Sequence, residues 1–225
     1  MAGPTERLVE RLKRAGLVRS APVERALLAV RREDFVWPGQ RPVAYEDVPL
    51  PLGDSGQTLS APHVVAAMLE ELELRPGLDV LEVGTGSGYN AALVAELVGP
   101  GGRVLTVERL ASLAGFAREN LRSAGYGGLV EVVVGDGSRG HPPESGEELY
   151  DRIAVTACAP SLPPPLKAQL RRGGVVVAPL GGARVQELRK FRKGGDGELS
   201  EERPAGKVVF VPLVGRYGYP EDGAS

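Results

Sequence analysis

The chain has 225 residues, which is long enough for one α/β domain with a modest extension and a sizeable hydrophobic core. Its formal net charge of −2 offers no basic surface to nucleic acid or to an anionic membrane, so neither partner is expected. Because no stretch approaches the roughly 20 apolar residues of a membrane span, and a single cysteine excludes an internal disulfide and a cysteine-based zinc site, we expect a cytoplasmic protein without a bound metal.

The first sixty residues are predicted to form an N-terminal extension. Apolar residues recur at helical spacing over residues 5–15 and 22–32, which indicates two short amphipathic helices. Residues 34–57 show no helical period and contain many prolines and glycines, yet they keep apolar and aromatic side chains. A segment of this kind inside a compact domain is often functional, so we expect an ordered arm on the substrate side of the molecule.

Between residues 61 and 215 helices and strands alternate, which predicts a Rossmann-like, doubly wound, mostly parallel seven-stranded α/β sheet with helices on both faces. Helices are expected over 61–74, 88–98, 110–124 and 164–171, and strands over 79–83, 103–107, 129–134, 152–157 and 174–179. Two further strands, 184–192 and 207–213, are expected to form a C-terminal pair with a hairpin-type loop at 194–197 between them. Residues 216–225 are expected to form a tail that is disordered from Tyr219 onward.

The most informative segment is a glycine-rich turn between the first predicted strand and the helix after it. Gly84, Gly86 and Gly88 stand at alternate positions, which lets the backbone approach a ligand at a helix N-terminus. A dinucleotide fingerprint would need its third glycine at position 89, where this chain has Tyr89. The next strand ends in Glu108, an acidic residue suited to ribose hydroxyls. The pattern is similar to motif I of class I S-adenosylmethionine-dependent methyltransferases, and it favours that cofactor.

Four loops follow parallel strands and should meet at the carboxyl edge of the sheet, where open α/β sheets bind ligands. They cover residues 84–88, 108–109, 135–137 and 156–160. Asp136, in the third loop, has two interpretations: an acceptor for an adenine amino group, or an ordinary turn residue between two glycines. Its place after the third strand favours the first.

Two hydroxyl residues, Thr58 and Ser60, precede the helix predicted at 61–74. As the N-cap, Ser60 would contribute roughly 1 kcal/mol to helix stability. Alternatively, the two hydroxyls, the nearby backbone N–H groups and the helix dipole form a cradle for a carboxylate. A capping serine keeps a hydroxyl proton to donate, so both interpretations stay open.

The chain offers no convincing general base beside these hydroxyls. His63 would share one helical turn with Ser60, without the strained turn that presents a hydrolase serine. His141 lies in a proline-rich loop, and Cys158 follows a buried strand. A carboxylate with a pKa near ~4 is already ionised at neutral pH and needs no base to accept a methyl group. This scarcity therefore favours a carboxyl acceptor held in line with the donor in a partly desolvated site.

Three segments carry a specific resemblance to the protein-L-isoaspartate O-methyltransferases. They are residues 44–53 (AYEDVPLPLG), 56–63 (GQTLSAPH) and 82–89 (EVGTGSGY), and shorter motifs extend the similarity to residues 209–213 (VFVPL). The resemblance implies methyl transfer from S-adenosylmethionine to the free carboxyl of L-isoaspartyl residues in damaged proteins, with S-adenosylhomocysteine as the product.

The resemblance also implies roles for individual residues. Ser60 matches the family's active-site serine, and the acceptor side is expected to include Thr58, Asp47, Val211 and Leu213. Together with the strand-end loops, it gives an expected set of cofactor-binding residues: Gln57, Thr58, Leu59, Glu82, Gly84, Thr85, Gly86, Ser87, Gly88, Glu108, Arg109, Asp136, Gly137 and Thr156.

Two other functions remain possible on the sequence: a class I methyltransferase with a different acceptor, and a non-catalytic adenosine-binding module. A nucleic-acid amine methyltransferase would carry an Asn/Asp-Pro-Pro-Tyr-like loop where this chain has residues 156–160 (TACAP), which argues against it. The idle module is disfavoured because both the glycine loop and the Thr58/Ser60 pair are intact.

Overall fold

The computed structural model describes residues 2–182, 185–202 and 204–221. The helices are α1 (Pro4–Arg14), α2 (Ala21–Ala29), α3 (Pro62–Leu72), α4 (Tyr89–Val98), α5 (Ala111–Ser123) and α6 (Pro164–Gln169), with short 3-10 turns η1 (Arg32–Asp34), η2 (Pro38–Val43) and η3 (Gly137–Arg139). The strands are β1 (Leu50–Pro51), β2 (Thr58–Leu59), β3 (Asp79–Val83), β4 (Arg103–Glu108), β5 (Val130–Val134), β6 (Tyr150–Val155), β7 (Leu170–Gly181), β8 (Gln186–Lys193), β9 (Leu199–Glu201) and β10 (Gly206–Val208). No helix in these ranges is both long and apolar enough to cross a bilayer.

The main sheet confirms the predicted fold class. Seven strands follow the order β10-β8-β7-β6-β3-β4-β5, and β9 adds an eighth by pairing with β8. Strands β7, β6, β3, β4 and β5 are parallel, whereas β8 runs antiparallel between β7 and β10. The central strands are almost continuously apolar because helices and turns cover both faces of the sheet.

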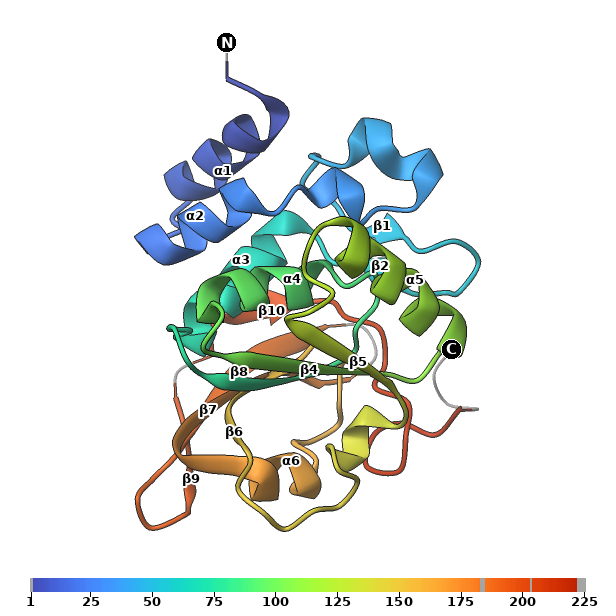
Figure 1. Ribbon diagram of the computed structural model, residues 1–225. Coiled ribbons are helices and arrows are strands. Elements are labelled where there is room, and N and C mark those ends of the chain that lie inside the picture. The colour runs from blue at the N-terminus through green and yellow to red at the C-terminus, as the bar shows by residue number, and fades with distance from the viewer. Residues whose placement is uncertain (1, 183–184, 203, 222–225) are drawn as a thin grey trace.

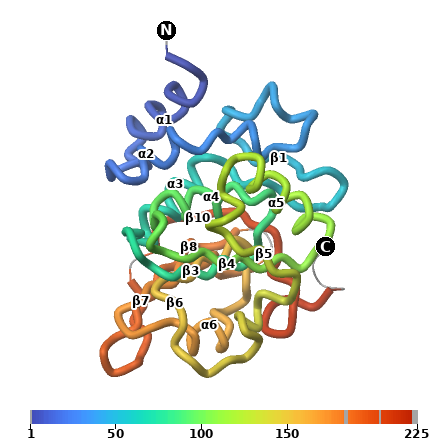
Figure 2. The backbone as a smooth tube through the Cα atoms, viewed as in Figure 1, coloured from blue at the N-terminus to red at the C-terminus, as the bar shows by residue number. Residues whose placement is uncertain are grey.

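The layers are uneven on the two faces of the sheet (Figure 1). Helices α3, α4 and α5 cover one face, with α1 and α2 as an outer layer, and α6 lies on the other face. The apolar stripes of the two N-terminal helices, represented by Leu8, Leu12, Val23 and Leu27, are buried in the same core as α4. The backbone trace in Figure 2 shows the N-terminal residues staying on this side of the sheet.

The arm at residues 34–57 is ordered, as expected from its apolar side chains. Phe35 is fully buried against Tyr89 of α4, with the ring centroids 5.6 Å apart, and Trp37 lies 4.9 Å from Phe116 of α5. The end of the arm pairs as β1 with β2 in a short antiparallel ladder that joins Leu50 to Leu59. This ladder fixes the strand that leads into Ser60.

Of the two interpretations of Ser60, the structure contradicts the one in which Ser60 is the N-cap of the next helix. The N-cap of α3 is Ala61, which makes no side-chain capping bond, and Pro62 is its first residue. Proline is favoured at this first helical position, so the helix begins one residue later than predicted. The hydroxyl of Ser60 is therefore not used for capping.

Two predictions near the C-terminus were also wrong in part. The glycine-rich loop 194–197 joins β8 to β9, and the strand expected over 207–213 ends at Val208. Tyr219, expected to be disordered, donates its backbone N–H to Leu213 O at 2.7 Å and its hydroxyl to Gly181 O. Position 184 of the predicted strand and residues 222–225 of the tail lie outside the described residues.

Candidate functional site

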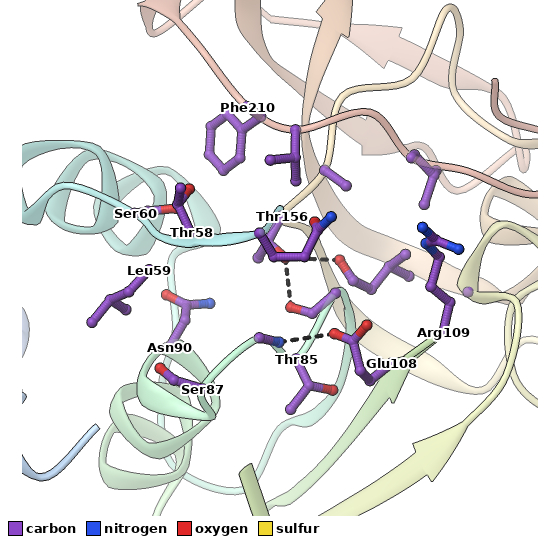
Figure 3. A pocket seen from close by; sticks show the side chains of 18 of the residues that line it. Thr58, Leu59, Ser60, Thr85, Ser87, Asn90, Glu108, Arg109, Thr156 and Phe210 are labelled. Atoms are coloured by element: carbon purple, nitrogen blue, oxygen red, sulfur yellow. Dashed lines mark hydrogen bonds between the residues drawn. The ribbon is translucent and has the colours of Figure 1, made fainter. Parts of the chain in front are cut away.

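A pocket of about 890 Å³ of empty space, part of it open to solvent, lies at the carboxyl end of β3 and β4. Its wall is built from the glycine loop after β3, the end of β4, the segment 57–60, helix α3 and the segment 210–214. Figure 3 shows the labelled side chains converging from these elements. The position agrees with the sheet edge predicted from the four strand-end loops.

The glycine loop depends on backbone shapes that favour glycine. Gly84, Gly86 and Gly88 have φ angles of +99°, +55° and +87°. A Cβ atom on Gly84 would lie 2.3 Å from Oγ1 of Thr156. That hydroxyl lies 2.6 Å from the Gly84 carbonyl oxygen, so Thr156 fills the space that the missing side chain leaves and fastens the loop to β6.

Glu108 holds the loop from the other strand. Its Oε2 accepts the Gly86 N–H at 3.0 Å, and its Oε1 accepts the Leu110 N–H at 3.0 Å. The residue is only 6% exposed, and with Arg109 it forms one end of the pocket (Figure 3). A carboxylate in this place has further lone pairs for ribose hydroxyls, as the sequence predicted.

Ser87 and Asn90 line the same pocket (Figure 3). Ser87 Oγ and Asn90 Oδ1 are buried polar atoms without a hydrogen-bond partner among the described residues. S-adenosylmethionine carries ribose hydroxyls and an amino-acid tail, so a carboxylate at one end of the pocket and unpartnered polar atoms at the other suit it. The residues present therefore fit this cofactor.

Glu82 lies in the sheet and is not among the residues of the pocket wall. It is completely buried and accepts hydrogen bonds from Asn90 Nδ2 at 2.8 Å and from Thr106 Oγ1 at 2.6 Å. Burial raises the pKa of Glu82 to about 7, and the two hydrogen bonds partly oppose that shift. The side chain supports a wall residue rather than facing the pocket itself.

Ser60 and Thr58 stand where two cavities meet. A second cavity of about 1000 Å³ of empty space, open to solvent, adjoins the first and is also lined by Pro49, His63 and Val209. The residues common to both walls are Thr58, Ser60, Val64, Thr156, Phe210 and Val211. The two hydroxyls thus lie between a pocket suited to a nucleoside and a cavity that opens to solvent.

The structure brings most of the predicted residues to these walls and keeps four others off them, of which Glu82 is described above. Gln57, Leu59, Thr85, Gly137 and Leu213 line the first pocket. Gly88 lies behind the wall as the N-cap of α4. Asp136 and Asp47 are the remaining two of the four, and each binds other residues.

Asp136 binds its own turn and the C-terminal segment. Its Oδ1 accepts from the N–H and the hydroxyl of Ser138, and its Oδ2 accepts the Arg216 N–H at 2.8 Å. A Cβ atom on Gly215 would lie 2.1 Å from Oδ1, so the segment at 215–216 packs tightly against this carboxylate. The carboxylate of Asp136 therefore stabilises its own turn, which was the alternative interpretation.

Asp47 contacts a residue that sequence reasoning set aside. Its Oδ1 accepts from the backbone N–H of His63 at 2.9 Å and lies 2.8 Å from the imidazole Nδ1. His63 lines the second cavity, whereas His141 and Cys158 line neither cavity. No local signal pairs residues 16 positions apart in a loop and a helix, so this contact needed the structure.

Comparison with known proteins gives one consistent result. A family model described as protein-L-isoaspartate(D-aspartate) O-methyltransferase matches residues 4–218. The protein-L-isoaspartate O-methyltransferase of Methanopyrus kandleri is 55% identical over 216 residues, covering 96% of this chain and 93% of the relative. That of Hyperthermus butylicus is 53% identical over 222 residues, covering 96% and 90%.

Solved structures agree with the sequence relatives. A structure named protein-L-isoaspartate O-methyltransferase has a TM-score of 0.82 at 32% identity and covers 95% of this chain and 67% of that one. A Plasmodium falciparum protein-L-isoaspartate O-methyltransferase, solved in complex with S-adenosyl-L-homocysteine, has a TM-score of 0.80 at 25% identity and covers 93% and 99%. The chain belongs to the protein-L-isoaspartate(D-aspartate) O-methyltransferase family.

Proposed function

We propose that this chain transfers the methyl group of S-adenosylmethionine to the free carboxyl of L-isoaspartyl residues in damaged proteins. The observation that carries the proposal is the position of Thr58 and Ser60 on the wall shared by the two cavities. A donor in the first pocket and an acceptor entering through the second would meet beside these hydroxyls. Family membership supports the same activity.

The acceptor carboxylate would be received by the hydroxyls of Ser60 and Thr58. Because Ser60 does not cap α3, its proton and both of its lone pairs remain for a ligand. The carboxylate is ionised at neutral pH, so no residue has to remove a proton from it. The bound cofactor supplies an electrophilic methyl group on a sulfonium.

The rest of the shared wall would keep water away from the reacting carboxylate. Val64 and Phe210 are buried apolar residues of both cavities, and Val211 is partly buried beside them. An apolar surround strengthens the attraction between a carboxylate and a cationic donor. Positioning and desolvation, without a general base, are the means of catalysis in this proposal.

The cofactor would be held by backbone and side chains of the first pocket. Glu108 would accept from the ribose hydroxyls, and Arg109, Gly137, Thr156 and the glycine loop line the same pocket. We assign Glu82, Gly88 and Asp136 supporting roles, because their side chains or backbone hold the wall from behind. Asp47 would act on the acceptor side through His63.

Isoaspartyl-containing proteins are the expected partners, and the segment 211–213 would offer its backbone to an extended peptide. The chain's weak net charge supports neither a nucleic-acid substrate nor a membrane surface. A cytoplasmic location stays a prediction from the sequence.

The test is transfer of a labelled methyl group from S-adenosylmethionine to matched isoaspartyl and aspartyl peptides. We expect a base-labile label on the isoaspartyl peptide alone. Ser60→Ala should lower turnover at least tenfold while S-adenosylhomocysteine affinity changes less than twofold, and Ser112→Ala, an exposed serine of α5, should change neither. Labelling of a different acceptor would favour another methyltransferase activity, and binding without any transfer would favour an idle adenosine-binding module.

A further inference from the structure

Asn90 has a half-satisfied amide on the wall of the cofactor pocket. Its Nδ2 donates to the buried carboxylate of Glu82 at 2.8 Å, whereas its Oδ1 is buried without a donor among the described residues. A buried acceptor left without a donor costs free energy, and such groups are scarce in folded proteins. Asn90 is also a residue of the first pocket, on a helix whose N-terminus follows the glycine loop.

The orientation of this amide follows from the groups beneath it. Above about pH 7, where Glu82 is ionised, its carboxylate can only accept hydrogen bonds, so the NH₂ group of Asn90 must face it. The other carboxylate oxygen accepts from Thr106 Oγ1 at 2.6 Å, and Thr85 Oγ1 lies 2.7 Å from that hydroxyl. Since Thr106 has one proton and gives it to Glu82, Thr85 is the donor in the second contact. All three supporting residues are at most 4% exposed.

Resting on the proposed function, we propose that Asn90 Oδ1 accepts a hydrogen bond from the ammonium group of the cofactor's amino-acid tail, and that Glu82 positions Asn90 for this contact. The ligand class is a nucleoside with a zwitterionic amino-acid tail, whose ammonium group is the donor. Glu108 and Arg109 form the opposite end of the pocket from Asn90 in Figure 3, which leaves that end for the nucleoside. Asn90 then distinguishes a nucleoside that carries the tail from one that lacks it.

Calorimetric titration with two ligands tests the proposal. S-adenosylhomocysteine carries the tail, and 5′-methylthioadenosine keeps the nucleoside and the sulfur without it. We expect Asn90→Ala to weaken the binding of S-adenosylhomocysteine at least tenfold and the binding of 5′-methylthioadenosine less than twofold. Equal losses for both ligands, or no loss for either, would overturn the proposal; the latter is expected if water alone serves the orphaned oxygen.

The matched control is the other asparagine of the chain. Asn120 donates its Nδ2 to Ser87 O at 3.0 Å, so it supports the same loop but is not part of the pocket wall. Asn120→Ala should therefore change both affinities by the same factor. A selective loss in this variant would show that loop distortion, rather than a contact with the tail, causes the discrimination.

Glu82→Gln tests the positioning role separately. A glutamine can donate to Asn90 as well as accept from it, so the amide is no longer confined to one orientation. We expect a selective loss for S-adenosylhomocysteine, smaller than that of Asn90→Ala, and no further loss when the two changes are combined. Additive losses would contradict the coupling. If the unaltered protein binds neither ligand, the proposed function fails; if it binds and methylates but Asn90→Ala is unselective, only this inference fails.

Discussion

Asp47 caps a helix that lies 16 residues further along the chain: its Oδ1 accepts the backbone N–H of His63 at 2.9 Å and lies 2.8 Å from the imidazole Nδ1. Ala61 gives α3 no side-chain cap, and Pro62 has no N–H to satisfy, so the first free donor of the helix is that of His63. The arm thereby ties down the helix that directly follows Ser60.

Asp47→Ala should loosen this junction. Loss of an N-cap acceptor costs about 1 kcal/mol of stability. We expect a lower unfolding free energy and a several-fold higher KM for an isoaspartyl peptide, with the Kd of S-adenosylhomocysteine changed less than twofold. Urea denaturation and steady-state kinetics measure these effects. Asp54→Ala, at an exposed position of the same arm, is the control and should leave both quantities unchanged.

Glu82→Gln should change how stability depends on pH. Burial raises the pKa of Glu82 to about 7 in the folded chain, so the folded state holds this proton more tightly than the unfolded state. The stability from this group is therefore complete below the unfolded pKa of about 4.5 and is lost as pH rises toward 7, by about 3 kcal/mol at most.

The measurement is the unfolding free energy of both proteins between pH 5 and 8. Glutamine does not titrate, so the variant should gain stability relative to the unaltered protein as pH rises through this window. Curves that stay parallel from pH 5 to 8 would show that Glu82 does not titrate there.

Gly84→Ala and Gly115→Ala should have opposite effects. The first places a Cβ atom 2.3 Å from Thr156 Oγ1, on a backbone with φ of +99°. We therefore expect lower stability and at least tenfold weaker binding of S-adenosylhomocysteine. The second lies on the exposed face of α5 with open space around it and should raise stability by about 0.5–1 kcal/mol. Thermal unfolding and calorimetry check both, and a neutral Gly84→Ala would contradict the tight loop.

Glu108→Ala should weaken the binding of nucleosides equally, whether or not they carry the amino-acid tail. The change removes the acceptor of the Gly86 and Leu110 N–H groups as well as the expected ribose contact. Calorimetry should show similar losses, at least tenfold, for S-adenosylhomocysteine and 5′-methylthioadenosine. A loss of affinity for S-adenosylhomocysteine alone would indicate that Glu108 contacts the amino-acid tail rather than the ribose.

Local pattern predicted much of this fold because the relevant signals are short-range. The strand Asp79–Val83 is bounded by a proline-glycine turn and a glycine loop, and its bounds were predicted to the residue. By contrast, the segment 209–213 looks like a strand but contributes only an isolated bridge from Pro212 to Cys158. Pairing with β8 ends at Val208, the Phe210 N–H donates to the side-chain Oε1 of Gln186 at 2.7 Å, and Pro212 has no N–H for a ladder.

The site was predicted best where function depends on backbone shape and least where it depends on distant partners. The glycine loop and Glu108 follow from spacing along the chain. The pairing of Asp47 with His63 and the support that Glu82 gives Asn90 depend on tertiary contacts that no residue spacing encodes. Ser60 is a further example. Helix α3 begins at Pro62 rather than at Ala61, so the Ser60 hydroxyl does not cap the helix.

The common wall of the two cavities also limits which damaged chains can be repaired. In the proposed function a carboxylate reaches Ser60 through the second cavity, past a rim that includes Val209, which is 71% exposed. A peptide segment that is still fastened into its own helix or sheet cannot thread that far; one released by local opening can. We therefore expect repair rates on folded proteins to follow the equilibrium constant for local opening of the damaged segment. The rate then depends on local unfolding of the substrate as well as on the presence of an isoaspartyl residue.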